Sequence, residues 1–378
     1  MTARFHSAHA AHDDWRQAVD ACLAQLSAAQ GAANLGFLYV TDRFVDHLEG
    51  ILDRLRGRTG IADWVGTAGI GVAANDGVGA CAEYFDRPAM AVMTAMLPAD
   101  SYRVFEPVHG GLGPFRTQYG GWLKSAQPLF GLIHGDPRNP LTSDIVAAMA
   151  EDLGLFFVGG LTSSRAEHPQ IADRIVEGGI SGVLFAGAVT VAAGLTQGCS
   201  PIGPVHTITD SDDNIIESID GRPALDVFKE DIGEVLARDL RRVGGYIYAA
   251  LPVAGSDTGD YLVRNLTGID PDKGWLSIGA QVEDGDRIMF TRRDRDSAEQ
   301  DLKRMLDGLA RRAGGQPIKG GVYCTCVARG PNLFGDDSEE LKFIRAALGD
   351  FPLVGFFGNG EICNDRLYGY TGVLALFL

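Results

Sequence analysis

Two segments near the C-terminal end of the chain combine groups that could bind or transform a small molecule. Cys326 and Arg329 stand three residues apart where the apolar segment 321–326 ends, and Glu361 follows the glycine-rich segment VGFFGNG. A guanidinium can hold a carboxylate through two parallel hydrogen bonds, and its charge would lower the pKa of a neighbouring thiol. These residues predict either a binding site for an acidic ligand or a reactive cysteine.

Small and polar residues gather at four places that follow apolar segments: residues 66–71, 159–165, 198–204, and the pair 324–330 with 358–363. Strand ends in layered folds open onto crevices, and backbone N–H groups at glycine turns can hold small anions. The alternative for each turn taken singly is an ordinary loop. Because four such turns occur together, we predict one small-molecule pocket, lined by Thr162, Ser163, Cys199, Ser200, Cys326, Arg329, Asn359 and Glu361.

The predicted pocket residues have distinct expected roles. Arg329 would pair with an acidic group of the ligand, and Glu361 would pair with an amine or with Arg329 itself. Catalysis by Cys326 would need a general base, and no histidine lies nearby in the sequence, so packing as a small hydrophobe is the favoured interpretation of this thiol. A cysteine-dependent hydrolase or transferase is therefore the least favoured function. Hydrogen bonds to the ligand would come from Thr162, Ser163 and Cys199.

Three histidines are candidates for the axial ligand of a haem. His134 and His206 have apolar neighbours in the sequence, and His109 lies in a glycine-rich segment. A lone histidine is weak evidence for a haem, and a hydrogen-bonded core or loop residue is the favoured interpretation of each. Haem remains a possible cofactor at this point, and no other cofactor is indicated.

Composition and charge exclude several classes of function. The 378 residues carry a net charge of −16, which repels phosphate backbones and anionic lipid, so neither nucleic acid nor a membrane is an expected partner. Six dispersed cysteines form neither a disulfide framework nor a paired zinc motif. The N-terminal segment shows no charged-then-apolar leader, so we expect a cytoplasmic protein with reduced thiols.

The order of predicted elements indicates a mixed α/β or α+β fold. Residues up to about 13 are predicted to be disordered, and residues 15–28 form an amphipathic helix. Strands and helices then alternate up to about residue 158, and strands with polar turns dominate residues 182–218. The uncharged segment 180–195 is short for a membrane span and predicts a buried hairpin. We expect two modules with mixed, largely antiparallel sheets covered by helices.

One internal similarity suggests duplication. VGTAGIG at residues 65–71 and VGFFGNG at residues 354–360 share a valine and three glycines, and each follows a predicted helix and strand. Glycines are abundant in this chain, so chance similarity is the alternative. Duplication would mean that two halves of the chain share an ancestor.

Several longer blocks resemble the FIST family, in which an N-terminal and a C-terminal module together form a sensory unit. The resemblance rests on VGTAGIG, FFVGGLTSS and the block GCSPIGPVHTITDSDDNIIESIDGRPALDVF at residues 198–228. In the second module it rests on the block at residues 260–294, on CTCVARG and on VGFFGNGEI. It implies an N-terminal tail and helix at residues 1–30, a first module at 31–242 and a second at 243–378.

The resemblance implies a function in bacterial signal transduction. It predicts a non-enzymatic sensor that binds an amino acid or related small metabolite, with a haem-based nitric-oxide or gas sensor as the alternative. Because the chain contains no recognisable signalling enzyme, its partner would be a separate one, such as a histidine kinase or a cyclic-dinucleotide enzyme.

Overall fold

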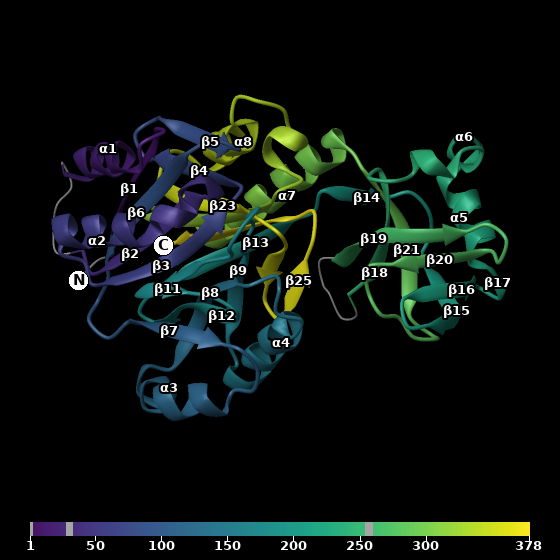
Figure 1. The fold of residues 1–378 in the computed structure, drawn as a ribbon, viewed down its shortest axis with the longest axis horizontal. Helices are drawn as coiled ribbons and strands as arrows, with labels where there is room; N and C mark the ends of the chain where they lie inside the picture. Colours follow the sequence, from purple (N-terminus) through teal and green to yellow (C-terminus); the bar gives the residue numbers. More distant parts are fainter. Residues whose placement is uncertain (1–2, 28–32, 254–259) are drawn as a thin grey trace. The chain divides into compact units, whose positions relative to one another are not determined.

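The computed structural model describes residues 3–27, 33–253 and 260–378 (Figure 1). Its contacts divide the chain into two compact units, Met1–Thr196 with Leu302–Leu378, and Gln197–Asp301. We call them the first and the second unit. The predicted fold class is confirmed, because helices cover mixed and antiparallel sheets. The predicted sequence modules, 31–242 and 243–378, are a separate division of the chain and stay a prediction.

Three six-stranded sheets build the first unit, and each has the same pattern of pairing. The first sheet contains, in spatial order, β1 (Arg4–Ala11), β6 (Ala89–Met96), β2 (Leu35–Thr41), β3 (Asp63–Gly69), β10 (Gln170–Ala172) and β11 (Arg174–Val176). The second contains β7 (Tyr102–Val108), β12 (Ile180–Ala186), β8 (Pro128–Gly135), β9 (Phe156–Leu161), β24 (Glu361–Cys363) and β25 (Arg366–Tyr368). The third contains β13 (Val191–Thr196), β26 (Gly372–Phe377), β22 (Gly320–Cys326), β23 (Pro352–Gly358), β4 (Gly71–Asp76) and β5 (Cys81–Phe85).

The shared pattern shows that the first unit is a threefold structural repeat. Each sheet is centred on one parallel pair, β2 with β3, β8 with β9, or β22 with β23, and the remaining neighbours pair antiparallel. The hairpin at the end of each sheet comes from a different repeat: β10–β11 follows β9 in the chain but joins β3, β24–β25 follows β23 but joins β9, and β4–β5 follows β3 but joins β23. The three repeats therefore exchange hairpins in a ring.

Three glycines occupy equivalent positions in the parallel pairs, and we call them the marker glycines. Gly66, Gly159 and Gly355 lie opposite Leu38, Ile133 and Tyr323, respectively. A Cβ atom at any of the three would lie 1.8 Å from the carbonyl oxygen of the opposite residue. Only glycine fits such a close backbone approach. The predicted similarity between residues 65–71 and 354–360 thus has a structural basis, and residues 158–159 supply a third copy of its Val-Gly pair.

One apolar core joins the three sheets, and its members occupy equivalent positions. Val65, Val158 and Val354 each precede one of the marker glycines, and all three are fully buried in this core. The outer face of the first sheet packs against α1 (Trp15–Ser27) and α2 (Leu48–Thr59), and that of the second against α3 (Gly113–Ala126) and α4 (Thr142–Leu153). Both faces of the central strands are covered, which explains their continuous apolar sequences.

The remaining elements of the first unit connect or cover the sheets. They are the short helices η1 (Asp42–His47) and η3 (Gly330–Asn332) and the helices α7 (Arg295–Ala313) and α8 (Glu339–Leu348). α7 begins in the second unit and continues into the first. In each repeat, a helix connects the two strands of the parallel pair, as the right-handed crossover rule for parallel strands requires.

The second unit is an antiparallel sheet that closes on itself. The pairings run from β21 through β15, β16, β20, β19 and β18 back to β21. Apolar side chains of these strands and of α5 fill the interior, including Phe228 and Phe290. Its elements are β14 (Cys199–Pro201), β15 (His206–Asp212), β16 (Ile215–Ile219), β17 (Arg222–Pro223), α5 (Ala224–Ile232), α6 (Glu234–Ala237), η2 (Leu240–Arg242), β18 (Ile247–Pro252), β19 (Tyr261–Asp270), β20 (Trp275–Ile278) and β21 (Arg287–Arg293).

Two expectations about local structure are wrong. Residues 4–11 form β1, paired with β6 over its whole length, whereas disorder was predicted, because their pairing partner lies far away in the sequence. The segment 180–195 is no hairpin, since β12 and β13 belong to different sheets, and only β12 is buried throughout. Among the described residues, no helix combines the length and hydropathy that a membrane span requires.

Candidate functional site

The strand ends of the first unit meet, as the sequence predicted, and hydrogen bonds join their loops. The Ser163 hydroxyl donates to the carbonyl of Phe357 and accepts from the amide of Ile70 at 2.8 Å. The hydroxyls of Thr162 and Thr67 lie 2.6 Å apart. Segments 66–71, 159–165 and 358–363 therefore form one connected region. Within this region Asn359 is exposed, and its backbone amide donates to the carbonyl of Leu161 at 3.0 Å.

Arg329 lies in the same part of the unit but faces an internal carboxylate. Its Nη2 and Nε atoms lie 2.7 and 2.8 Å from Oε1 of Glu340, and both side chains are inaccessible to solvent. Tyr323 donates to the same oxygen at 2.6 Å, and the amide of Gly330 donates to Oε2 at 3.2 Å. Burial acts against the charged guanidinium, but the Glu340 carboxylate outweighs it and raises the pKa of Arg329. A ligand carboxylate could reach Arg329 only by displacing Glu340.

Glu361 is enclosed, whereas the sequence placed it at the mouth of an open space. Oε2 accepts hydrogen bonds from the amide and the hydroxyl of Thr371 at 3.2 and 2.8 Å, and Oε1 has no hydrogen-bond partner among the described residues. Burial raises the pKa of this carboxyl to about 8. Glu361 is therefore mainly protonated at neutral pH.

Cys326 does not have the environment of a nucleophile. Its thiol is buried, and burial together with the nearby Glu361 raises its pKa to about 12. The expected lowering by Arg329 is present but is the smaller effect. A thiol that stays protonated is a weak nucleophile, so the geometry favours the packing role.

The other two predicted residues belong to the second unit. The carbonyl of Cys199 accepts a hydrogen bond from Tyr261 at 2.6 Å, and the Ser200 hydroxyl lies 3.0 Å from Oδ2 of Asp294. Their part in a ligand site stays a prediction. In the described part of the chain, none of the eight predicted residues lines any of the three pockets discussed below.

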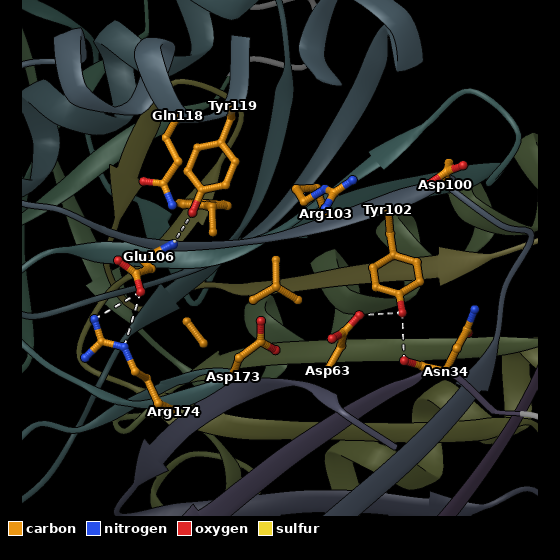
Figure 2. A pocket seen from close by; sticks show the side chains of 13 residues that line it. Asn34, Asp63, Asp100, Tyr102, Arg103, Glu106, Gln118, Tyr119, Asp173 and Arg174 are labelled. Atoms are coloured by element: carbon orange, nitrogen blue, oxygen red, sulfur yellow. Dashed lines mark hydrogen bonds and ion pairs between the residues drawn. The ribbon is translucent and has the colours of Figure 1, made fainter. Parts of the chain in front are cut away.

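A pocket of about 440 Å³ opens elsewhere in the first unit, where β7 and α3 face the start of β3 and the turn between β10 and β11. We call it the polar pocket (Figure 2). Its lining carries groups of both signs, with Asp63, Asp173 and Glu106 among the carboxylates and Arg103 and Arg174 as the cations. The sequence analysis did not find it, because these residues come from separate elements and no motif joins them.

Two side chains and one backbone carbonyl fix one end of the polar pocket. The hydroxyl of Tyr102 lies 2.8 Å from Oδ2 of Asp63 and 2.7 Å from the carbonyl oxygen of Asn34, and it can donate to one of them at a time (Figure 2). Burial and the Asp63 carboxylate both raise the pKa of Tyr102, so this hydroxyl remains a donor over the whole physiological pH range.

Asp173 lies in the turn between β10 and β11 with a left-handed φ of +58°. Its Oδ1 accepts a hydrogen bond from the amide of Trp64 at 3.0 Å. Burial is the main effect that raises the pKa of Asp173 to about 6, and the charges of Asp63 and Glu106 add to it. The hydrogen bond from Trp64 and the charge of Arg56 act in the opposite direction but are outweighed. The pocket therefore holds a half-buried carboxylate whose charge is only partly compensated.

A second pocket, at the place in the repeat that is equivalent to the polar pocket, shows which residue types the fold accepts there. This pocket has a volume of about 480 Å³, and we call it the apolar pocket because its lining is mainly apolar, with Thr190, Arg312 and Gln316 as its polar residues. Leu129 and Phe156 line it where Asn34 and Asp63 line the polar pocket, since Phe156 and Asp63 each stand three residues before a marker glycine. The repeat thus forms with apolar residues at this place. The charged groups of the polar pocket are not needed for the fold, and burying them costs free energy.

A third pocket, of about 890 Å³, adjoins the polar pocket along the outer edge of β11, and we call it the groove. The two share Glu106, Gln118, Tyr119 and Arg174. Arg174 donates to Oε1 of Glu106 from Nε at 3.2 Å and from Nη2 at 3.1 Å (Figure 2). This ion pair connects β7 to β11 at the boundary between the two hollows.

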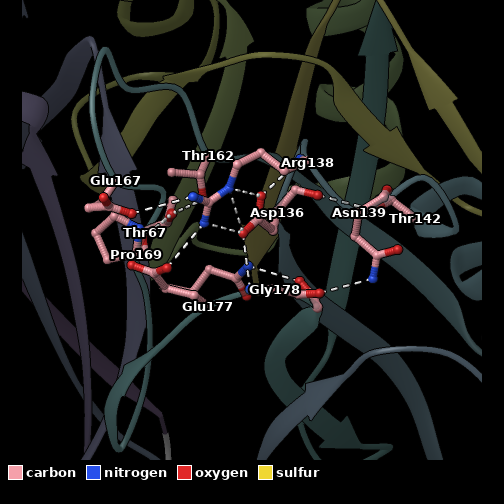
Figure 3. Close-up of polar contacts among 12 residues, drawn as sticks. Thr67, Asp136, Arg138, Asn139, Thr142, Thr162, Glu167, Pro169, Glu177 and Gly178 are labelled. Atoms are coloured by element: carbon pink, nitrogen blue, oxygen red, sulfur yellow. Dashed lines mark hydrogen bonds and ion pairs between the residues drawn. The ribbon is translucent and has the colours of Figure 1, made fainter.

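The sequence analysis also missed a polar network at the end of β8 (Figure 3). Asp136 is fully buried and accepts hydrogen bonds from the amide and Nη2 of Arg138, both at 2.8 Å, and from the amide of Gly178 at 3.0 Å. Burial acts to raise the pKa of Asp136, but these hydrogen bonds outweigh it and lower the pKa. Arg138 also contacts Glu167 and Glu177. One guanidinium thus contacts three carboxylates, and these contacts hold the loops together.

Comparison with known proteins identifies the family. Residues 34–222 match the FIST N domain and residues 224–364 match the FIST C domain. The chain belongs to the FIST family. FIST domains are associated with signal transduction and small-ligand sensing. The resemblance found in the sequence is thereby confirmed.

Relatives of this FIST protein occur in mycobacteria and carry no functional name. It is 33% identical over 312 residues to the uncharacterized protein Rv0628c of Mycobacterium tuberculosis strain H37Rv, covering 78% of this chain and 80% of the relative. It is 31% identical over 311 residues to the uncharacterized protein Mb0898c of Mycobacterium bovis, covering 78% and 79%. Every residue that lines the polar pocket lies within the FIST N match.

The three candidate histidines of this FIST protein have surroundings that do not favour a haem. His134 is fully buried against the rings of Tyr39 and Phe356, with its Nε2 3.1 Å from the Tyr39 hydroxyl. Both ring nitrogens of His206 are hydrogen-bonded to aspartates. His109 lines the groove, but the carboxylates of Glu49, Glu106 and Glu177 line it too and would repel haem propionates.

Proposed function

We propose that this protein is a ligand-binding sensor that takes up an amino acid or a related small metabolite in the polar pocket. The main support is that charged groups of both signs line this pocket, whereas the lining of its equivalent in the repeat is mainly apolar, with Arg312 as its one charged side chain and no carboxylate side chain among the described residues. An amino acid presents an ammonium group and a carboxylate, and the pocket presents partners for both. A volume of about 440 Å³ suits a molecule of that size.

We place the ligand in the polar pocket rather than between the strand-end loops. Arg329 and Glu361 are inaccessible to solvent, so a ligand would have to open the region and displace Glu340 to reach them. The polar pocket opens to solvent without such a rearrangement. A bound ligand would report its presence to a separate signalling enzyme, such as a histidine kinase or a cyclic-dinucleotide enzyme, inside a bacterial cell.

Isothermal titration calorimetry and thermal unfolding with the twenty amino acids test the proposal. We expect at least one of them to bind and to raise the unfolding temperature, because a ligand that binds only the folded state stabilises it. Asp63→Asn should weaken that binding, since Asp63 lines the pocket. Asp53→Asn makes the same chemical change at an exposed position on α2 and should leave binding unchanged. Absence of binding by all twenty, or equal effects of the two substitutions, would contradict the proposal.

A further inference from the structure

The polar pocket contains more carboxylates than cations, and some of these groups are already paired with each other. Four carboxylates line it against two guanidinium groups, and one of these, Arg174, already lies against Glu106. Tyr102 can donate to Asp63, and Arg56 donates to the backbone carbonyl of Asp173. No cationic side chain hydrogen-bonds to the carboxylate of either aspartate within the described residues. The hollow therefore offers an incoming cation two carboxylates at one end and a paired guanidinium at the other.

The equivalent apolar pocket serves as an internal control for this distribution. Where Asp63 stands in the polar pocket, Phe156 stands in its counterpart, at the equivalent register of the corresponding parallel pair, β8 with β9. A sheet that forms with phenylalanine there does not need the aspartate for its stability. Asp63 and Asp173 are therefore available to recognise a ligand, and a ligand cation between them would relieve their mutual repulsion.

Arg174 and Glu106 form the part of the pocket that can respond. Their side chains are 63% and 51% exposed, so their ion pair contributes little to the stability of the fold. A ligand carboxylate has the same planar geometry as the Glu106 carboxylate and can take over both hydrogen bonds from Arg174. Exchange would release Glu106 at the boundary with the groove, which shares both residues with the pocket.

We propose that the polar pocket selects a basic amino acid, holding an ammonium group between Asp63 and Asp173 while its carboxylate replaces Glu106 on Arg174. This inference rests on the proposed function and adds the class of ligand and the exchange of partners. Tyr102 holds Asp63 in place through its hydroxyl. The released Glu106 then alters the lining of the groove, so that binding in one hollow changes the other.

The test uses L-lysine and L-lysinamide, which differ only in the carboxylate. We expect wild-type protein to bind L-lysine, and Glu106→Gln to raise its affinity by about two- to fivefold, because the internal competitor loses its charge. The same substitution should leave the affinity for L-lysinamide unchanged or lower it. Arg174→Gln should have the opposite effects. It should lower the affinity for L-lysine by about tenfold and leave the affinity for L-lysinamide unchanged or raise it.

The outcomes separate this inference from the proposed function. If another amino acid binds but L-lysine does not, the basic class is wrong and the sensor function survives. If L-lysine binds but Glu106→Gln affects it and L-lysinamide alike, the exchange on Arg174 is wrong. If no amino acid binds, the proposed function itself fails. Both substituted side chains are exposed, so melting curves without ligand should match the wild type and exclude misfolding as the cause.

Discussion

Arg329 and Glu340 form an ion pair that is closed off from solvent, with Nη2 of the arginine 2.7 Å from Oε1 of the glutamate. Tyr323 and the amide of Gly330 also donate to this carboxylate. The arrangement converts a residue that the sequence assigns to a ligand into one that holds the loop after β22 against α8. Its consequences for stability can be measured without a ligand.

Removing Arg329 should destabilise the protein strongly. Arg329→Met leaves Glu340 buried without its cation, and breaking a buried pair from one side costs about 3–5 kcal/mol. Chemical denaturation measures the change, with Arg58→Met at an exposed position of α2 as the control, expected within about 0.5 kcal/mol of wild type. An Arg329→Met variant of wild-type stability that no longer binds an anionic ligand would instead support the sequence-based role.

Glu361 should make the stability of the first unit depend on pH. Its pKa is about 8 in the folded protein against an ordinary value of 4.5, so the folded state binds this proton more tightly than the unfolded state. Stability therefore falls as the pH rises from about 4.5 to about 8. Glu361→Gln mimics the protonated form and should flatten this dependence in thermal melts. Glu151→Gln, exposed on α4, should not; an equal effect of the two would count against a raised pKa.

Asp173→Asn should increase stability while weakening ligand binding. The folded-state pKa of Asp173 is about 6 against an ordinary value of 3.8, so its carboxylate destabilises the fold increasingly as the pH rises from about 4 to about 6. The amide removes that effect. Melts at pH 4 and pH 7 should show the gain only at the higher pH, and Asp53→Asn should show none. A loss of stability at pH 7 would mean that Asp173 is needed for the turn rather than for a ligand.

The marker glycines should not tolerate a methyl group. Gly159→Ala would place Cβ 1.8 Å from the carbonyl oxygen of Ile133, so the parallel pair must separate or the backbone must shift. We expect a loss of several kcal/mol or failure to fold, measured by soluble yield and by denaturation. Gly121→Ala on α3 meets no atom within 4 Å and should be neutral or stabilising by about 0.5–1 kcal/mol. Similar behaviour of both variants would disprove the close packing.

His206 should titrate above its ordinary value in the second unit. Its burial lowers the pKa, but hydrogen bonds to Asp220 and Asp231 at 2.6 and 3.0 Å outweigh burial and raise it. The imidazolium form therefore stabilises the fold below pH 6.5, and this contribution is lost as the pH rises through the folded-state pKa. NMR titration of the ring should show the raised value. Asp231→Asn should lower it, and an unchanged titration would show that the contact is not made in solution.

Some of this architecture is readable from the sequence. Alternating apolar segments and helices predict mixed sheets with helical cover. The glycine-rich segments predicted as turns belong partly to strands, since Gly66 and Gly159 lie within β3 and β9. The Val-Gly pairs at residues 65–66 and 354–355 reveal a repeat, because a glycine is the only residue that fits under the neighbouring carbonyl. Even the meeting of the loops around Thr162 and Ser163 follows from strand ends lying at one edge of layered sheets.

The site itself required the tertiary structure. Nothing local in the sequence assigns the hairpin after β9 to the sheet of another repeat, yet that exchange brings Asp173 to the pocket that contains Asp63. Likewise the ten residues between Arg329 and Glu340 contain no signal that the two side chains pair and exclude a ligand. The sequence determined the family and the class of fold, because periodicity and glycine constraints act over a few residues. Which charges are buried together and which face an open pocket depends on long-range pairing, and only the folded chain decided it.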